Sequence, residues 1–184
     1  MSAYHIVLVH FPIALWTTAV LAIFVRAFSD GEFAKACDRA LLPLLTLSII
    51  MGGAAFIIGL MVWPLPTVTS TPLGRNHMLS ASWSLSYWIL LTIVRWRAGE
   101  ALWRGMGRWI MAGLAAIGGG LLTVTGTLGG HLTGTSTAVS EVLRFLGWEI
   151  YTTYYVPDFT LAIIVVASVI LLAIGFWGRS RFAG

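Results

Sequence analysis

The chain has 184 residues, of which 58% are hydrophobic and only 10% are charged. Soluble domains carry a charge on about a quarter of their residues, so this composition excludes an ordinary soluble domain and indicates a membrane protein. A single cysteine excludes a disulfide within the chain and the paired cysteines that attach c-type haem. The net charge of +4 comes with no nucleic-acid-binding motif, so we expect no nucleic acid partner.

Five windows of roughly 20 apolar residues predict five transmembrane helices. The windows cover residues 4–25, 41–63, 77–94, 109–130 and 159–177, and none contains Lys, Arg, Asp or Glu. No basic segment precedes the first window, so we expect a retained helix and not a signal peptide. We find no internal repeat and no linker. The sequence therefore predicts one all-α membrane domain over residues 1–184, a five-helix bundle.

The longest loop, between the fourth and fifth windows, contains one further helical pattern. Apolar residues at Val139, Val142, Leu143 and Leu146 follow helical spacing within the stretch 137–148. We expect this short segment to lie in the membrane surface.

The basic residues predict the orientation of the bundle. The side that holds the N-terminus and the loops 64–76 and 131–158 carries only Arg75 and Arg144, whereas the other side carries the remaining nine of the eleven. Loops rich in Lys and Arg stay in the cytoplasm. The N-terminus is therefore expected outside and the C-terminus inside, in a multi-pass protein of the bacterial inner (cytoplasmic) membrane.

All four histidines fall on the predicted outer side. His5 and His10 open the first window, His77 opens the third and His131 follows the fourth. Neutral imidazole is a good ligand for iron, copper and zinc, and ionisable residues within a membrane indicate function. We therefore predict His10, His77, His131 and His5 as metal ligands, without a decision on which of them pair.

The face of the first helix that includes His10 carries Ile13, Ala14 and Thr17, and such small or weakly polar faces are expected to look into a bundle. His5 lies about 140° from His10 around the helix, so the two would serve different ligands, or His5 would lie at headgroup level.

Haem b requires two facing imidazoles, small residues beside the macrocycle and cations near its propionates. The histidines could hold one or two such haems near the periplasmic face. Arg75 and Asn76 beside His77, and Arg144 in the long loop, are the candidate partners of the propionates.

The segments "HIVLVHFPIAL" and "LGGHL", at residues 5–15 and 128–132, resemble two motifs of an uncharacterised family of predicted bacterial membrane proteins. That family typically opens with H-P-x-x-V-H-F-P-I and ends its core with G-G-x-L. The resemblance covers about residues 4–135. Ile6 replaces the first proline of the motif, and "TGTSTAV" follows in place of a Y-R-x-G-V-G-V run. Because members occur beside c-type cytochromes and other redox modules, the resemblance implies a haem or electron-transfer role.

These observations favour a membrane-bound, b-type cytochrome-like electron-transfer subunit that is itself not catalytic. Its expected partners are membrane lipid and a periplasmic redox protein, such as a c-type cytochrome or a dehydrogenase subunit, with a quinone as a further candidate. Two alternatives stay open. Met78 beside His77 supplies a thioether that suits copper handling, and a purely structural membrane anchor would satisfy its histidines with water and backbone carbonyls.

Overall fold

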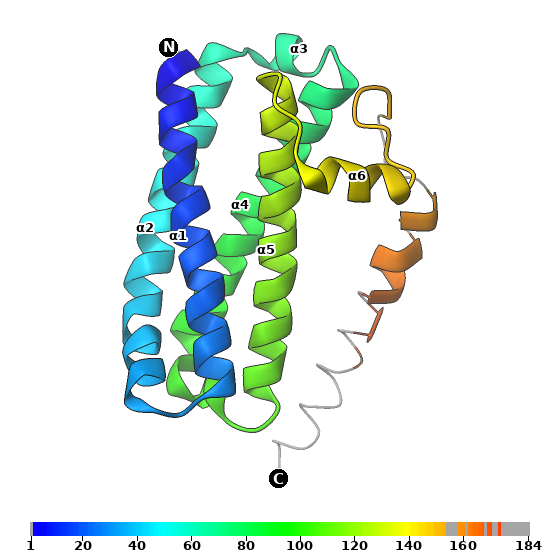
Figure 1. The fold of residues 1–184 in the computed structure, drawn as a ribbon. Coiled ribbons are helices and arrows are strands. Elements are labelled where there is room, and N and C mark those ends of the chain that lie inside the picture. The colour runs from blue at the N-terminus through cyan, green and yellow to red at the C-terminus, as the bar shows by residue number, and fades with distance from the viewer. Residues whose placement is uncertain (1, 154–157, 161, 168, 171–172, 174–184) are drawn as a thin grey trace.

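Four long helices, packed side by side, make up most of the molecule (Figure 1). The structure, a computed structural model, describes residues 2–153, 158–160, 162–167, 169–170 and 173. The elements in chain order are α1 Ser2–Phe28, α2 Glu32–Val62, α3 Leu65–Val68, α4 Pro72–Ala98, the 3₁₀ helix η1 Gly99–Trp103, α5 Gly107–Leu132 and α6 Ala138–Phe145. Four of these, α1, α2, α4 with η1, and α5, are long and apolar enough to cross a membrane.

The four predicted windows over 4–25, 41–63, 77–94 and 109–130 are confirmed as helices, and each observed helix extends beyond its window. The largest extension is at the start of α2, where charged residues add more than two turns. Lys35 forms an ion pair with Glu32 one turn earlier, and Asp38 is buried. Side chains three or four positions apart lie on the same helix face, so charged pairs can stabilise a helix where no apolar run exists.

The predicted fifth helix over 159–177 stays a prediction. Residues 158–160, 162–167, 169, 170 and 173 are helical, and the other positions of this window lie outside the described residues. Thr160 donates a hydrogen bond from Oγ1 to the main-chain oxygen of Leu146, at 2.9 Å, which connects this segment to the end of α6.

The chain forms two helical hairpins, α1–α2 and α4–α5, joined by the short helix α3 (Figure 1). Each helix packs on two neighbours: α1 on α2 and α5, and α4 on α5 and α2. Helices α1 and α4 therefore lie on one diagonal of the bundle, and α2 and α5 on the other. We call the end that holds Tyr4, α3 and Leu132 the histidine end, and the end that holds residues 29–31 and η1 the arginine end.

Two tryptophans, one from each of the diagonal helices α1 and α4, pack against each other in the core of the bundle. Trp16 and Trp88 stack with ring centroids 5.6 Å apart and an interplanar angle of 6°. Stacked aromatic pairs add to the free energy gained from the large apolar area they bury. Gly52 on α2 lies against Trp16, and Gly118 on α5 lies against Trp88, so the lack of a side chain at each glycine makes room for an indole ring.

Helix α6 runs across the outside of α5 at the histidine end (Figure 1). Its N-terminus has a capping box between Thr137 and Ser140, which satisfies two backbone N–H groups. Leu143 packs into a small cluster with Leu73, Leu128 and Ile150, whereas Val142 and Phe145 are exposed. The helix predicted within 137–148 is therefore present.

Candidate cofactor site

His5 contacts the neighbouring helix α2 near the end of that helix. Its Nδ1 lies 3.0 Å from the main-chain oxygen of Ala55, and a Cβ placed on Gly59 would come within 2.8 Å of its Cε1. The ring of Trp63 meets the imidazole edge-on, with centroids 5.4 Å apart. The imidazole is half-buried and held on three sides.

His77 makes the corresponding contacts on the other hairpin. Its Nδ1 lies 3.2 Å from the main-chain oxygen of Thr125 on α5, and a Cβ on Gly129 would come within 3.0 Å of its Cε1. The imidazole is half-buried. His5 and His77 lie on helices α1 and α4 at the same end of the bundle (Figure 1).

The hydrogen bonds fix the tautomer of both rings. A carbonyl oxygen only accepts hydrogen bonds, so Nδ1 must carry a proton, and in the neutral ring Nε2 then keeps its lone pair. No hydrogen bond of either Nε2 atom is found within the described part of the chain. A histidine that binds a metal usually donates its other N–H to a carbonyl or carboxylate, which orients the ring. His5 and His77 are both held in this way.

His10 does not join this pair. It is exposed, and its Nδ1 lies 2.6 Å from the main-chain oxygen of Ile6 on its own helix. The expectation that its face looks into the bundle is wrong, because Ile13, Ala14 and Thr17 are exposed as well. The inward face of α1 is the one that buries Trp16, whose stacking partner lies across the bundle.

His131 is buried, and both of its nitrogens already have partners. Nδ1 lies 2.7 Å from the hydroxyl of Tyr151, and Nε2 lies 2.6 Å from Oγ of Ser140. The ring thus ties the last turn of α5 to α6 and to the loop that follows. To bind a metal, His131 would have to give up one of these hydrogen bonds.

The three residues predicted to contact haem propionates lie at the histidine end but make different contacts. Asn76 is buried and donates from Nδ2 to the main-chain oxygen of Thr153, at 2.5 Å. Arg144 on α6 pairs with Glu141 at 3.0 Å and with Glu149 at 3.5 Å. Arg75 is exposed beside Asn76.

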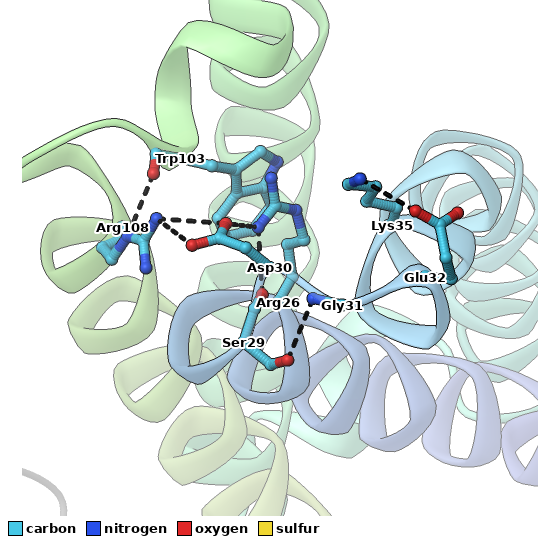
Figure 2. Close-up of polar contacts among 8 residues, drawn as sticks. All are labelled: Arg26, Ser29, Asp30, Gly31, Glu32, Lys35, Trp103 and Arg108. Carbon is cyan, nitrogen blue, oxygen red and sulfur yellow. Dashed lines mark hydrogen bonds and ion pairs between the residues drawn. The ribbon is translucent and has the colours of Figure 1, made fainter.

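Charged groups at the arginine end form a network that no motif in the sequence indicated (Figure 2). Asp30 accepts hydrogen bonds from Arg26 at 2.5 Å and from Arg108 on α5 at 3.0 Å. The guanidinium of Arg26 also lies over the ring of Trp103, 5.5 Å from its centroid. The arginines hold the pKa of the Asp30 carboxyl below its usual value, with the hydrogen bond from Arg26 the largest cause.

The fold and its apolar surfaces define an all-α membrane protein with a pair of oriented imidazoles at one end of its bundle. Residues 2–140 match the family described as "Predicted membrane protein (DUF2231)". This match spans most of the chain, so the protein belongs to that family. No curated protein and no solved structure matches the chain.

Proposed function

We propose that this protein is an electron-transfer subunit that holds haem b between His5 and His77, with the histidine end on the periplasmic side of a bacterial cytoplasmic membrane. The observation that carries this proposal is that the two imidazoles have the same tautomer and the same kind of hydrogen-bond partner. Both donate Nδ1–H to a carbonyl of a neighbouring helix, and both keep an Nε2 lone pair without a partner among the described residues.

The number of donors favours haem over a bare metal ion. Structural zinc sites need four protein ligands and catalytic ones three, and copper sites are built from similar sets. Within the described residues there is no group of three or more His, Cys, Asp or Glu side chains that could hold an ion. Two imidazoles suffice for haem, because the macrocycle supplies the four equatorial nitrogens. This comparison favours haem over an ion held by those four residue types alone.

The residues present fit haem in their donor chemistry. The two rings come from different helices, rest on glycines and carry the proton on Nδ1, which leaves Nε2 to bind iron. Arg75 and Arg144 would be the candidate partners of the propionates, although Arg144 would first have to leave the carboxylates of Glu141 and Glu149, and Asn76 would act through the loop it holds. Haem would supply the one-electron chemistry, and the chain's own part would be to orient both axial ligands.

The position of the pair at one end of the bundle suggests which partners exchange electrons with it. The four histidines all lie at the histidine end, and the other end carries arginines and carboxylates. A site at that depth serves a periplasmic redox protein, such as a c-type cytochrome or a dehydrogenase subunit, or a quinone that enters from the lipid. The exposed apolar helix faces would contact membrane lipid.

A visible spectrum of the purified protein, oxidised and then reduced with dithionite, tests the proposal. We expect a sharp α-band on reduction, with the haem identified by a pyridine haemochrome assay. His5→Ala and His77→Ala should each remove the low-spin spectrum, and His10→Ala is the matched control because His10 lies on α1 but faces outward. Protein that retains its fold and takes up no haem would leave the structural-anchor function, in which the histidines serve only as hydrogen-bonding groups.

A further inference from the structure

His5 and His77 make the same set of contacts on two different hairpins. Each imidazole donates Nδ1–H to the carbonyl of one residue and rests on the glycine four positions later, Ala55 with Gly59 and Thr125 with Gly129. The same ring edge faces each glycine: Cε1 is the nearest atom, Nδ1 the second and Nε2 the third.

The sequence positions of these contacts repeat as well. On the first helix of each hairpin, His77 follows His5 by 72 positions and Trp88 follows Trp16 by the same interval. On the second helix the shift is 70 positions, from Ala55 to Thr125 and from Gly59 to Gly129. Eleven positions separate histidine from tryptophan in both hairpins, which is about three helical turns and places both side chains on one face.

Burial follows the same register along α2 and α5. Four positions are buried on both helices at the 70-residue shift: Leu41 and Met111, Leu45 and Ala115, Ser48 and Gly118, Gly52 and Leu122. The residue types differ at each of these positions, and only the placement of the inward face repeats. Because the buried positions repeat while the residue types at them differ, the sequence alone showed no internal repeat.

The packing of the bundle is that of a quasi-two-fold arrangement. Helices α1 and α4 lie on one diagonal, α2 and α5 on the other, and the contacts α1–α2 and α1–α5 correspond to α4–α5 and α4–α2. Trp16 and Trp88 come from the two diagonal helices and stack in nearly parallel planes, an arrangement that a two-fold axis between them allows. Parallel repeats related by an axis along the membrane normal are a known architecture of membrane proteins.

We infer that the two hairpins are copies of one structural unit, and that their histidines form two equivalent halves of one site that binds a single cofactor on the axis between them. The identity of that cofactor rests on the proposed function. The two carbonyl-glycine pairs act as positioning groups: the carbonyl selects the Nδ1–H tautomer, and the glycine lets the ring approach the helix closely enough to reach it.

Alanine at either glycine should displace the ring it supports. The added Cβ would lie 2.8 Å from Cε1 of His5 in Gly59→Ala and 3.0 Å from Cε1 of His77 in Gly129→Ala, both closer than an ordinary carbon contact. Gly53→Ala and Gly126→Ala are matched controls on the same helices, because nothing lies within 4 Å of a Cβ at those positions.

The experiment combines two measurements on the full-length protein in detergent. ¹⁵N NMR of histidine-labelled, haem-free protein reports the tautomer of each ring, with signals assigned by replacing each histidine in turn. We expect the Nδ1–H tautomer for both His5 and His77, and its loss at His5 in Gly59→Ala and at His77 in Gly129→Ala. Haem titration then reports stoichiometry, for which we expect one haem per chain. Each glycine variant should lower haem affinity about 10- to 100-fold, and neither control should.

The outcomes separate this inference from the proposed function. Two haems per chain, the Nδ1–H tautomer at only one of the two rings, or a loss of affinity in only one of the two glycine variants would overturn the inference of two equivalent halves. Protein in which both rings show the expected tautomer and respond to their glycines, but which takes up no haem, would overturn the proposed function and leave the positioning groups in place.

Discussion

Arg95 on α4 and Asp38 on α2 form a buried ion pair near the arginine end, with Nη2 of the arginine 2.8 Å from Oδ1 of the aspartate. Nε of Arg95 donates to the same oxygen at 2.9 Å, and the side chains are only 11% and 6% exposed. The pair joins the two hairpins where α2 begins. Because both charges are removed from solvent, each depends on the other to offset its loss of hydration.

Removing one member of this pair is expected to cost more than removing both. Asp38→Ala leaves the Arg95 guanidinium buried without its counter-charge and should lower the free energy of unfolding by about 3–5 kcal/mol. The double variant Asp38→Leu with Arg95→Met replaces the pair with apolar groups and should lie within about 1 kcal/mol of the wild type. Unfolding by SDS titration in mixed micelles measures both values.

Lys35→Ala serves as the control for the ion-pair prediction. It removes an exposed pair with Glu32 on the same helix and should change the free energy of unfolding by less than about 1 kcal/mol. If the single and double variants at Asp38 and Arg95 lost the same stability, the cost would come from packing and not from the unpaired charge.

Asp30 is expected to give the protein an acid-sensitive component of stability. Its pKa is lower in the folded protein than its usual value because Arg26 and Arg108 donate hydrogen bonds to it (Figure 2). A group with a lowered folded pKa contributes stability above its unfolded pKa and loses it as pH falls through the folded value. The Tm of Asp30→Asn should therefore be lower than that of the wild type at neutral pH, and the two should converge in acid.

Thermal unfolding followed by circular dichroism between neutral pH and strong acid tests this dependence. Glu100→Gln is a suitable control, because no ion-pair partner of Glu100 is found in the described part of the chain. An acid-induced loss of stability in Asp30→Asn equal to that of the wild type would show that another carboxylate is responsible.

His131 is expected to act as a hydrogen-bonding tie between α5, α6 and the loop after α6. His131→Ala removes the ring's hydrogen bonds to the buried Ser140 hydroxyl and to Tyr151, and Ser140 Oγ keeps only the capping bond from the Thr137 N–H, so the unfolding free energy should fall by about 1–3 kcal/mol. Proteases should cut the loop around Gly134 faster, while the spectrum of the haem that we propose for His5 and His77 should not change. His10→Ala should change neither property. Loss of haem in a His131→Ala protein whose loop stays protected would identify His131 as a ligand.

Most of the helical fold followed from apolar windows, and the departures have a physical explanation. A window that excludes charge locates the membrane core of a helix but not its ends, so the windows place the first turns of α2, with Glu32 and Lys35, in a loop. Gly99, with φ of 53°, ends α4 in a backbone conformation that glycine adopts without strain. The windows therefore predicted where the four described long helices lie better than where each begins and ends.

The sequence predicts that the four histidines lie at one end of the bundle, but it does not predict which of them form a pair. Helical position alone places His5, His10, His77 and His131 at one end. Whether a histidine faces inward depends on which neighbouring helix offers a carbonyl and a glycine at that height, and this requires the packing of α1 on α2 and of α4 on α5. The shared spacing of His5–Trp16 and His77–Trp88 is the signal in the sequence that would have found the pair.

Gly52 is expected to be essential for the aromatic stack in the core. A Cβ on Gly52 would lie 2.9 Å from Cη2 of Trp16, so Gly52→Ala must displace the ring that stacks on Trp88. Overpacking of this kind costs about 1–3 kcal/mol and should weaken the near-UV circular dichroism of the tryptophans. Gly53→Ala, one position away in open space, should instead be neutral or stabilising by up to about 1 kcal/mol, since alanine favours helix. Equal effects at both positions would mean that the stack tolerates the added methyl group.

The proposed orientation predicts which end of the bundle is reached from outside the cell. In a Cys37→Ser background, which removes the one native cysteine, Ser70→Cys tests the histidine end and Glu100→Cys tests the arginine end; both positions are exposed. A membrane-impermeant maleimide applied to intact bacterial cells with a permeabilised outer membrane should label Ser70→Cys and leave Glu100→Cys unlabelled. Rupture of the inner membrane should make the two equal. The expected difference in intact cells follows from the basic residues near the arginine end, which by the positive-inside rule should keep that end in the cytoplasm. Labelling of Glu100→Cys alone in intact cells would invert the topology, and the His5–His77 pair would then face cytoplasmic electron donors instead of periplasmic ones.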